Sequence, residues 1–393
     1  MSETTRRVTP RDAPAPGGAR GALRRLRNLS DSHRSISVIV GWALVAAILP
    51  LIVQVPPLSS FQTTTVWVDG FANAGVFILL ALGLNIVVGL AGLLDLGYAA
   101  FFAIGSYAYA FGASPHFGLA IPFWPMLLVG ALSAATFGLL LGAPTLRLRG
   151  DYLAIVTLGF GEIVPAVFLN ADKITSGTNG IGGIQKPQLF GLVKFTFTDP
   201  FPFFFTMAAI LAVTMILVYR LQDSRLGRAW MAVREDELAA ASSGVNTVTT
   251  KLLAFALGAS TAGLAGVFNA SKLSIVSPDQ FMFTVSFTVL AMVVLGGMGN
   301  VWGVAVGAFV LYEIQSVVLK GLNQFFQSQH IPVLEKVDFV LYQFLLYGLA
   351  LVGMMLLRPE GLFPSTRRRL ELHEAEAEGE VEDEVVAEPM GGA

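Results

Sequence analysis

The sequence predicts an all-α, polytopic membrane protein with about ten transmembrane helices. Hydrophobic residues make up 54% of the 393 residues and charged residues only 13%, and the apolar residues form long uninterrupted runs instead of short alternations. A hydrocarbon core about 30 Å thick needs a helix of roughly 20 apolar residues. Because unpaired backbone is too costly in lipid for an open sheet, we expect only helices inside the bilayer.

Ten apolar runs are the expected spans: 36–53, 71–90, 96–111, 119–141, 152–169, 201–219, 252–270, 281–295, 301–319 and 339–357. The first has no small-residue cleavage site near its end, so it is interpreted as a retained signal anchor. Several runs are shorter than the usual minimum of about 17 residues. Such short, Gly-interrupted runs favour broken or re-entrant helices, and the run 96–111 could cross the membrane fully or re-enter it.

Charge divides the chain into five segments. Residues 1–35 form an Arg-rich arm and residues 364–393 a tail that turns from basic to acidic, and both compositions predict disorder. Two membrane halves, 36–219 and 252–363, flank a charged loop, 220–251. If the spans alternate from a cytoplasmic N-terminus, every Arg falls inside, whereas only Lys251 among the seven Lys residues does. The Arg distribution therefore predicts that both termini are cytoplasmic.

The loop 220–251 has the pattern of an amphipathic helix. Leu226, Trp230 and Val233 recur at helical spacing, and Gly244 is a natural stop. The charged side chains that cover the rest are Arg225, Arg228, Arg234, Glu235, Asp236 and Glu237. Two interpretations remain open: a helix that merely connects two spans, or a docking helix that transmits force from a cytoplasmic motor.

Several kinds of chemistry are excluded or not expected. The chain has no Cys, and its four His residues all lie in predicted loops or tails, so neither a disulfide nor a metal site is expected. No Lys follows a Gly, which excludes a G-K-[ST] phosphate loop. We expect no catalytic residue, no cofactor and no nucleic-acid partner. Active transport would take its energy from a partner that binds ATP.

Small residues predict close helix packing. Gly303 and Gly307 form a GxxxG pair on one expected span. The tetrapeptide Gly-Leu-Ala-Gly occurs twice, at Gly89–Gly92 and at Gly263–Gly266, on spans expected to run in opposite directions. We therefore count Gly89, Gly92, Gly263 and Gly266 among the packing residues and expect an inverted five-plus-five repeat.

Acidic residues near or within the spans are the candidates for a translocation path. A charge at the bilayer centre costs on the order of 3 kcal/mol. Glu162 and Glu313 lie mid-span, where either a hydrogen bond between helices or a place on the path would explain them. Asp95 is also placed to cap a helix that begins near Gly97.

Six motifs together resemble a known family. They are GLAG at 89–92 with LGYAAFFAIG at 96–105, LRLRGDYLAIVTLGFGEIV at 146–164, TSGTNGI at 175–181, LGRAWMAVREDELAAASSGV at 226–245, VLGGMGNVWG at 294–303 and RPEGLF at 358–363. They resemble the LivM-type permeases of branched-chain amino acid ABC importers, over about residues 71–363.

The resemblance implies a multi-pass protein of the bacterial inner membrane and an assembly around it. The implied partners are a homologous second permease, two cytoplasmic ATPases and a periplasmic amino-acid-binding protein, besides membrane lipid. It also makes 220–251 the coupling loop, with Arg225, Arg228, Trp230, Val233, Arg234, Glu237 and Gly244 as its coupling residues. The family pattern is Glu-Ala-Ala, three residues, then Gly. Glu237 lies one residue early relative to Gly244.

For the substrate path, the resemblance suggests donors for the amino acid carboxylate at a broken-helix N-terminus and acceptors for its ammonium group. The expected residues are Asp95, Tyr98, Thr157 and Glu162. Three alternatives stay open: a same-family permease for urea or a short-chain amide, an ion-coupled secondary transporter, and a membrane-embedded enzyme. The sequence leaves open which amino acid is preferred and whether the second permease is a different chain or a second copy.

Overall fold

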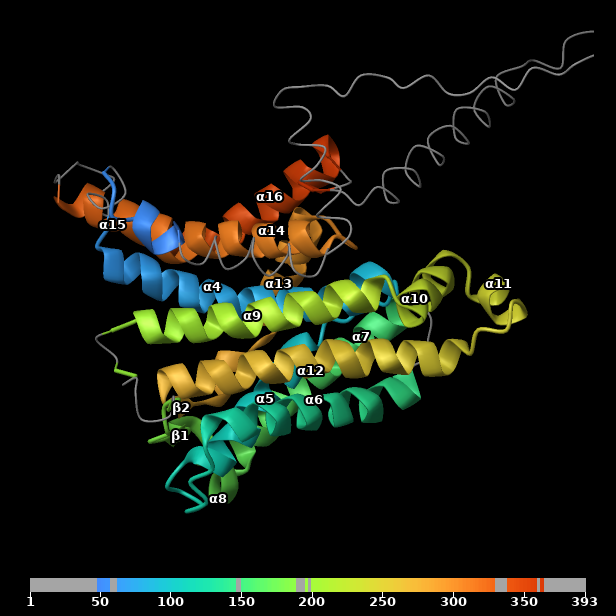
Figure 1. The fold of residues 1–393 in the computed structure, drawn as a ribbon, viewed down its shortest axis with the longest axis horizontal. Coiled ribbons are helices and arrows are strands. Elements are labelled where there is room, and N and C mark those ends of the chain that lie inside the picture. Colours follow the sequence, from blue (N-terminus) through green and yellow to red (C-terminus); the bar gives the residue numbers. More distant parts are fainter. Residues whose placement is uncertain are drawn as a thin grey trace, which may run out of the picture.

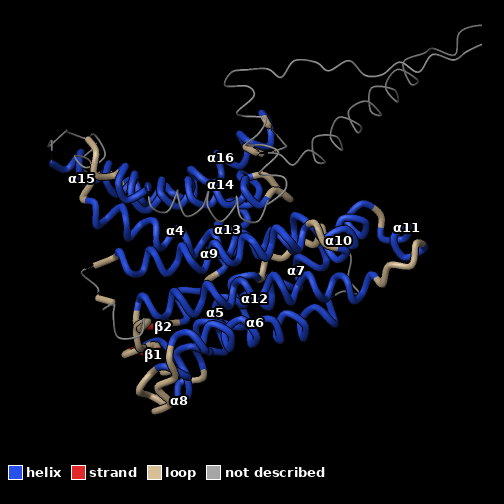
Figure 2. The backbone as a smooth tube through the Cα atoms, viewed as in Figure 1, coloured by secondary structure: helices blue, strands red, loops and turns tan. Residues whose placement is uncertain are grey.

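The computed structural model describes residues 48–56, 62–145, 150–188, 195–196, 199–328, 338–358 and 361–363. Within them the chain is almost wholly helical (Figure 2), and its long helices lie side by side between two ends of the molecule (Figure 1). One end carries α10 (Arg225–Glu235) and α11 (Glu237–Ser242), and we call it the α10–α11 end. The opposite, β1–β2 end carries the strands Ile181–Gly182 and Ile275–Val276.

The first membrane half contains α4 (Thr64–Leu84), the π-helix η1 (Asn85–Leu90), α5 (Tyr98–Ala113), α6 (Phe123–Thr145), α7 (Asp151–Asn170), α8 (Asp172–Thr175), the 3₁₀ helix η2 (Gly177–Asn179) and α9 (Phe201–Gln222). The second contains α12 (Thr247–Leu273), η3 (Pro278–Phe281), α13 (Phe283–Gly296), α14 (Val301–Glu313), the π-helix η4 (Ile314–Val318), α15 (Leu319–Ser328), η6 (Phe339–Tyr342) and α16 (Gln343–Leu357).

Seven helical runs in the described residues are long and apolar enough to cross a membrane, and Phe339–Met354 is a shorter apolar helix. The all-helical class is therefore confirmed, whereas the expected count of ten spans is not. Most of the expected first span, 36–53, lies outside the described residues. The run expected at 96–111 is the 16-residue helix α5, which is too short to span a bilayer alone.

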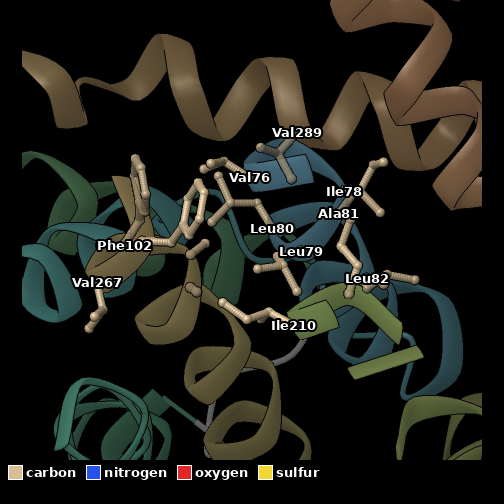
Figure 3. Close-up of a cluster of buried hydrophobic side chains, with 14 of the residues drawn as sticks. Val76, Ile78, Leu79, Leu80, Ala81, Leu82, Phe102, Ile210, Val267 and Val289 are labelled. Atoms are coloured by element: carbon tan, nitrogen blue, oxygen red, sulfur yellow. The ribbon is translucent and has the colours of Figure 1, made fainter. Parts of the chain in front are cut away.

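Helix α4 forms the centre of the bundle. Fifteen of its 21 residues are buried, and α9, α12, α13 and α14 all pack around it. Figure 3 shows Leu79 and Leu80 of α4 among side chains from four neighbouring helices. Those neighbours are Phe102 of α5, Ile210 of α9, Val267 of α12 and Val289 of α13. Residues 74–84 of α4 are apolar on all sides, which is typical of a helix enclosed by other helices.

Helix α5 begins near the middle of the bundle. After η1 the chain turns back as a non-helical segment, 91–97, and α5 starts where the Tyr98 hydroxyl donates to the carbonyl of Gly258, 2.7 Å away and close to the middle of α12. It ends at the β1–β2 end, where the Ala113 carbonyl accepts from the amide of Gln185. Segment 91–97 and α5 therefore make one discontinuous crossing.

Helix α13 also begins inside the bundle, and its first turn meets that of α5. The amide of Ala99 donates to the Ser286 hydroxyl over 2.9 Å. From this contact α13 runs toward the α10–α11 end, where the following Gly299 accepts a hydrogen bond from the Gln222 side chain at the end of α9. Two short helices thus run in opposite directions from adjacent N-termini.

Glycines set the closest helix crossings. A Cβ at Gly105 of α5 would lie 2.5 Å from the Cα of Gly263 in α12, which itself packs on Gly130 of α6. On the other side of the bundle, a Cβ on Gly307 would stand 2.5 Å from the Cα of Gly296, and Gly303 also packs on Gly296.

The first Gly-Leu-Ala-Gly tetrapeptide is not at such a crossing. Gly89 is the penultimate residue of the π-helix and lies beside Asn85 of the same helix, and Gly92 follows that helix with φ +70° against the Arg234 side chain. Gly263 and Gly266, in contrast, lie within α12, so the two tetrapeptides occupy different structural positions. Their likeness in sequence therefore does not support the expected repeat.

Candidate functional site

The charged loop folds into two short helices, each begun by a side-chain cap. The Ser224 hydroxyl accepts from the amide of Gly227 at the start of α10, and Asp236 accepts from the amides of Leu238 and Ala239, at 2.8 and 3.0 Å, at the start of α11. Because Asp236 takes an extended backbone conformation to cap α11, it ends α10. The single docking helix expected from the sequence is therefore interrupted at Asp236.

The apolar stripe of α10 faces the protein's own membrane domain, which corrects our expectation for Trp230 and Val233. The resemblance implied that both side chains couple the loop to a partner. Instead Trp230 is fully buried, Val233 is 6% exposed, and the Trp230 indole donates to the carbonyl of Thr250 at 2.7 Å. The stripe is the side by which α10 attaches to the start of α12.

Charged contacts strengthen this attachment. Lys251 of α12 forms a 2.6 Å ion pair with Glu237 of α11, and its side chain is only 8% exposed. On α10, Arg234 Nη1 donates to the carbonyl of Gly89 at 2.5 Å. Both Glu237 and Arg234 therefore bind their own chain.

The outward side of the α10–α11 pair carries the other predicted coupling residues. Arg225 and Arg228 are exposed, and Leu238 of α11 is 68% exposed. Gly244 follows α11 with φ +87° and has open space around it. Leu238 was not among our predicted coupling residues, although an isolated Leu in a charged segment was a readable signal.

Three of the four predicted path residues meet where α5 begins. Asp95 Oδ1 accepts from the amide of Gly97, as the predicted cap would, and the Thr157 hydroxyl of α7 accepts from the amide of Leu96 at 3.1 Å. Tyr98 binds Gly258 and Thr261 of α12. Asp95 is 2% exposed, and its Oδ2 has no hydrogen-bond partner among the described residues.

The electrostatics of this constellation favour an anion. The first turns of α5 and α13 meet here through the Ala99 amide and the Ser286 hydroxyl, and the N-terminus of each helix carries a partial positive charge of roughly half a unit. Asp95 lies two residues before Gly97, the N-cap of α5, and accepts from its amide. The unpaired oxygen of the Asp95 carboxylate can accept a hydrogen bond from the ammonium group of an amino acid. The same side chain can also position the backbone amides of the helix N-terminus to bind the carboxylate of that amino acid.

Glu162, the fourth predicted path residue, is not part of this constellation. It lies on the exposed face of α7, between Ile155 at 63% and Ile163 at 59% exposure. The opposite face of α7 carries Thr157 and Gly161, which pack on segment 91–97. Gly161 and Glu162 are adjacent in the sequence, but Gly161 faces the bundle and Glu162 faces outward.

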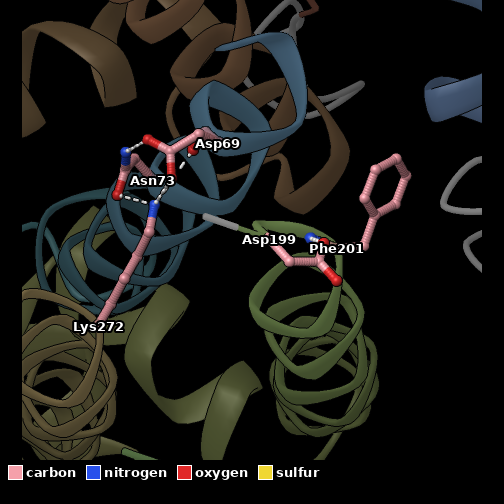
Figure 4. Close-up of polar contacts among 5 residues, drawn as sticks. All are labelled: Asp69, Asn73, Asp199, Phe201 and Lys272. Carbon is pink, nitrogen blue, oxygen red and sulfur yellow. Dashed lines mark hydrogen bonds and ion pairs between the residues drawn. The ribbon is translucent and has the colours of Figure 1, made fainter. Parts of the chain in front are cut away.

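A polar cluster near the β1–β2 end was not predicted from the sequence. Lys272 of α12 pairs with Asp69 of α4 at 2.8 Å and donates to Asn73 at 2.6 Å, and Asn73 donates to Asp69 (Figure 4). Asp69 and Asn73 occur at helical i, i+4 spacing, a signal that could have been read. A cavity of about 360 Å³ between α4 and η4 borders Asp69 and Asn73.

Glu313 ends α14 beside this cavity. It is 6% exposed, and its carboxylate lies against Gly70 with no hydrogen-bond partner among the described residues. In the part of the chain that the structure describes, no group of three or more His, Cys, Asp or Glu side chains could hold a metal ion.

Residues 66–357 match the family model described as "Branched-chain amino acid transport system / permease component". The chain belongs to this family. The match runs from α4 to the end of α16, so it includes both membrane halves and the α10–α11 pair.

Individual relatives agree with the family match. The chain is 44% identical over 325 residues to the high-affinity branched-chain amino acid permease protein LivM of Salmonella typhimurium, covering 78% of this chain and 72% of the relative. It is 42% identical over 356 residues to LivM of Escherichia coli, covering 86% and 78%. A more distant relative is LivH of Salmonella typhimurium, 25% identical over 260 residues, covering 62% and 82%. No solved structure matches the chain.

Proposed function

We propose that this chain is the LivM-type permease subunit of an ATP-driven importer for branched-chain amino acids. The observation that carries the proposal is the family match over 66–357, supported by identity above 40% to two LivM proteins. Those relatives give no support to a urea, amide or ion-coupled transporter. In this proposal the chain forms the translocation path with a second, LivH-like permease.

The proposed assembly places two ATPases at the α10–α11 end and a periplasmic binding protein at the β1–β2 end. The exposed side chains of Arg225, Arg228 and Leu238 suit a partner that offers acidic groups around a small apolar pocket. The confinement of Arg to expected cytoplasmic segments supports this orientation, with both termini inside. ATP is bound by the partner subunits, so the permease itself needs no cofactor.

The proposed path runs between the exposed face of α7 and the second permease. Glu162 supports this, because a carboxylate exposed to lipid at mid-span costs on the order of 3 kcal/mol, whereas one facing a water-filled path does not. In this arrangement Asp95, Tyr98 and Thr157 lie on the other, buried side of α7, so they join the path only in a state in which α7 moves away from segment 91–97. The buried position of Asp95 corresponds to a closed state.

We also propose an inverted repeat, and this proposal rests on the order of the elements along the chain. A long helix, a connecting segment, a short helix and a long helix follow one another as α4, 91–97, α5 and α6. A similar order recurs as α12, the connection 274–282 with β2 and η3, α13 and the helical run from α14 to α15, and α12 runs in the opposite direction to α4. Rocking of two such halves against each other is a known basis for alternating access.

The test is uptake of labelled leucine into proteoliposomes that contain this chain, its partner permease, the ATPases and the binding protein. We expect uptake that needs both ATP and binding protein. Arg228→Glu reverses an exposed charge, and Gly244→Trp forces a side chain onto a left-handed backbone, so both should abolish coupled uptake. Uptake by this chain alone, driven by an ion gradient and unchanged in these variants, would refute the proposal.

A further inference from the structure

Arg234 connects the α10–α11 pair to the start of the discontinuous crossing. Its guanidinium donates to the carbonyl of Gly89, the penultimate residue of η1. The last carbonyls of a helix lack intrahelical partners and favour a cation. A Cβ on Gly92 would stand 2.6 Å from the Cγ of Arg234, so the aliphatic part of Arg234 covers the turn that follows.

The segment that begins at this turn leads directly to the constellation of Asp95, Tyr98 and Thr157. It comprises residues 91–97, and it is anchored at its far end by the bond from the Leu96 amide to Thr157 and by the cap of Asp95 on Gly97. The segment is only seven residues long and non-helical, and a chain of that length reaches at most about 3.3–3.6 Å per residue. A displacement at Gly92 can therefore be passed to the N-terminus of α5 over a short length of chain.

A cavity leaves room for such a displacement. It measures about 270 Å³ and lies between segment 91–94, the start of α7 and the α10–α12 junction. Its lining residues include Leu93, Leu94, Asp151, Arg234 and Lys251. The space is partly open to solvent and is bordered by exposed residues such as Leu94 and Asp151, so the segment can shift into it without repacking the helices.

The other attachments of the pair lead to a different element. Trp230 binds Thr250 and Glu237 pairs with Lys251, and both partners belong to α12, a continuous 27-residue helix that packs along α4, α5 and α6. Of these three contacts, that of Arg234 is the one that reaches the non-helical segment.

We propose that Arg234 is a positioning residue that transmits movement of the α10–α11 pair to segment 91–97, and so moves Asp95 and the N-terminus of α5 within the path. This rests on the proposed importer function. It also changes the role given to Arg234 by the sequence, from a contact with the ATPase to an internal connection. The moving segment enters the 270 Å³ cavity.

The test compares Arg234→Met, which keeps the aliphatic part and removes the guanidinium, with Arg220→Met, the same replacement at the exposed end of α9. In the full reconstituted complex, Arg234→Met should keep ATP hydrolysis within about twofold and lower leucine transported per ATP by about tenfold, a typical coupling factor. Arg220→Met removes a guanidinium that does not contact segment 91–97, so it should leave the leucine transported per ATP unchanged. Arg234→Lys, which keeps the charge, should be intermediate.

A second readout follows the segment itself. Because the chain has no Cys, spin labels can be placed at Leu94→Cys and Tyr152→Cys, both exposed positions, and their distance measured with and without ATP. We expect an ATP-dependent change that Arg234→Met removes. An unchanged response, or a parallel loss of ATP hydrolysis and transport, would overturn the role of Arg234. Absence of ATP-driven uptake in the parent complex would instead refute the importer function.

Discussion

At the scale of single residues, buried polar side chains decide how α5 is held. Tyr98 and Tyr107 are both 1% exposed on α5. The hydroxyl of Tyr98 binds Gly258 and Thr261, whereas that of Tyr107 has no hydrogen-bond partner among the described residues. The two tyrosines are therefore equally buried, and they differ in whether the hydroxyl forms a hydrogen bond.

We predict that Tyr98→Phe destabilises the protein by about 1 kcal/mol, the usual net value of one hydrogen bond, and that Tyr107→Phe is neutral or slightly stabilising. Thermal unfolding of the purified permease complex in detergent would measure both. Equal shifts in the two variants would contradict the assigned role of the Tyr98 hydroxyl.

The ion pair of Lys272 with Asp69 predicts unequal costs for its two partners. The side chain of Lys272 is 9% exposed and that of Asp69 is 50% exposed. Asp69→Ala leaves a buried cation with reduced pairing, whereas Lys272→Met leaves an anion that water can reach. We expect roughly 1–3 kcal/mol for Asp69→Ala, reduced from the value for fully buried pairs, and less for Lys272→Met.

Unfolding measurements on both single variants and on the double variant would test this asymmetry. The double variant should be less destabilised than Asp69→Ala alone, because it removes the unpaired cation. If the loss of stability in the double variant equals the sum of the losses in the two single variants, the two side chains are not coupled.

At the scale of elements, the glycine crossing of α5, α6 and α12 determines how closely these helices approach. Gly105→Ala and Gly263→Ala would each force a methyl group into neighbouring backbone. Gly159 lies on α7 with nothing near its Cβ position. Its replacement by Ala is therefore a control for helix propensity alone.

We predict a loss of about 1–3 kcal/mol for each of the two crossing variants, the usual cost of overpacking. Gly159→Ala should be neutral or slightly stabilising, because Ala is the better helix former. Thermal unfolding of the three variants would distinguish these results. A stable Gly105→Ala variant would mean that the crossing can widen without cost.

At the scale of the whole molecule, the proposed orientation has a direct test in a chain without Cys. Leu238 on α11 is 68% exposed and Phe117, beyond the end of α5, is 42% exposed. In intact spheroplasts, a membrane-impermeant thiol reagent should label Phe117→Cys and leave Leu238→Cys unlabelled. Inverted membrane vesicles should reverse the pattern, and the opposite result would reverse the proposed orientation.

The helical class and most of the spans could be predicted, because a long apolar run in lipid satisfies its own backbone hydrogen bonds only as a helix. The pairs of small residues at Gly263 and at Gly303 with Gly307 were also readable, since they recur at helical spacing on one face. The cap at Asp95 depends on residues two apart, so it too was accessible from local sequence.

The direction of the α10 stripe was not predictable from its pattern. Helical spacing identifies an apolar face, but it does not say whether that face meets the same chain or a partner. The direction of the Trp230 side chain is shown by its hydrogen bond to Thr250, which lies 20 residues further along the chain. Glu162 shows the same limit, because its neighbour Gly161 points into the bundle and only the packing of α7 assigns the two sides.

The sequence by itself determined that this chain is a helical membrane protein with a charged segment between two apolar halves, because hydrophobic length and charge distribution are local properties. Only the tertiary structure decided that α5 and α13 begin face to face inside the bundle, that Lys272 pairs with Asp69 203 residues away, and that Arg234 reaches Gly89. These contacts depend on which helix surfaces meet, and that choice is made by packing over the whole molecule.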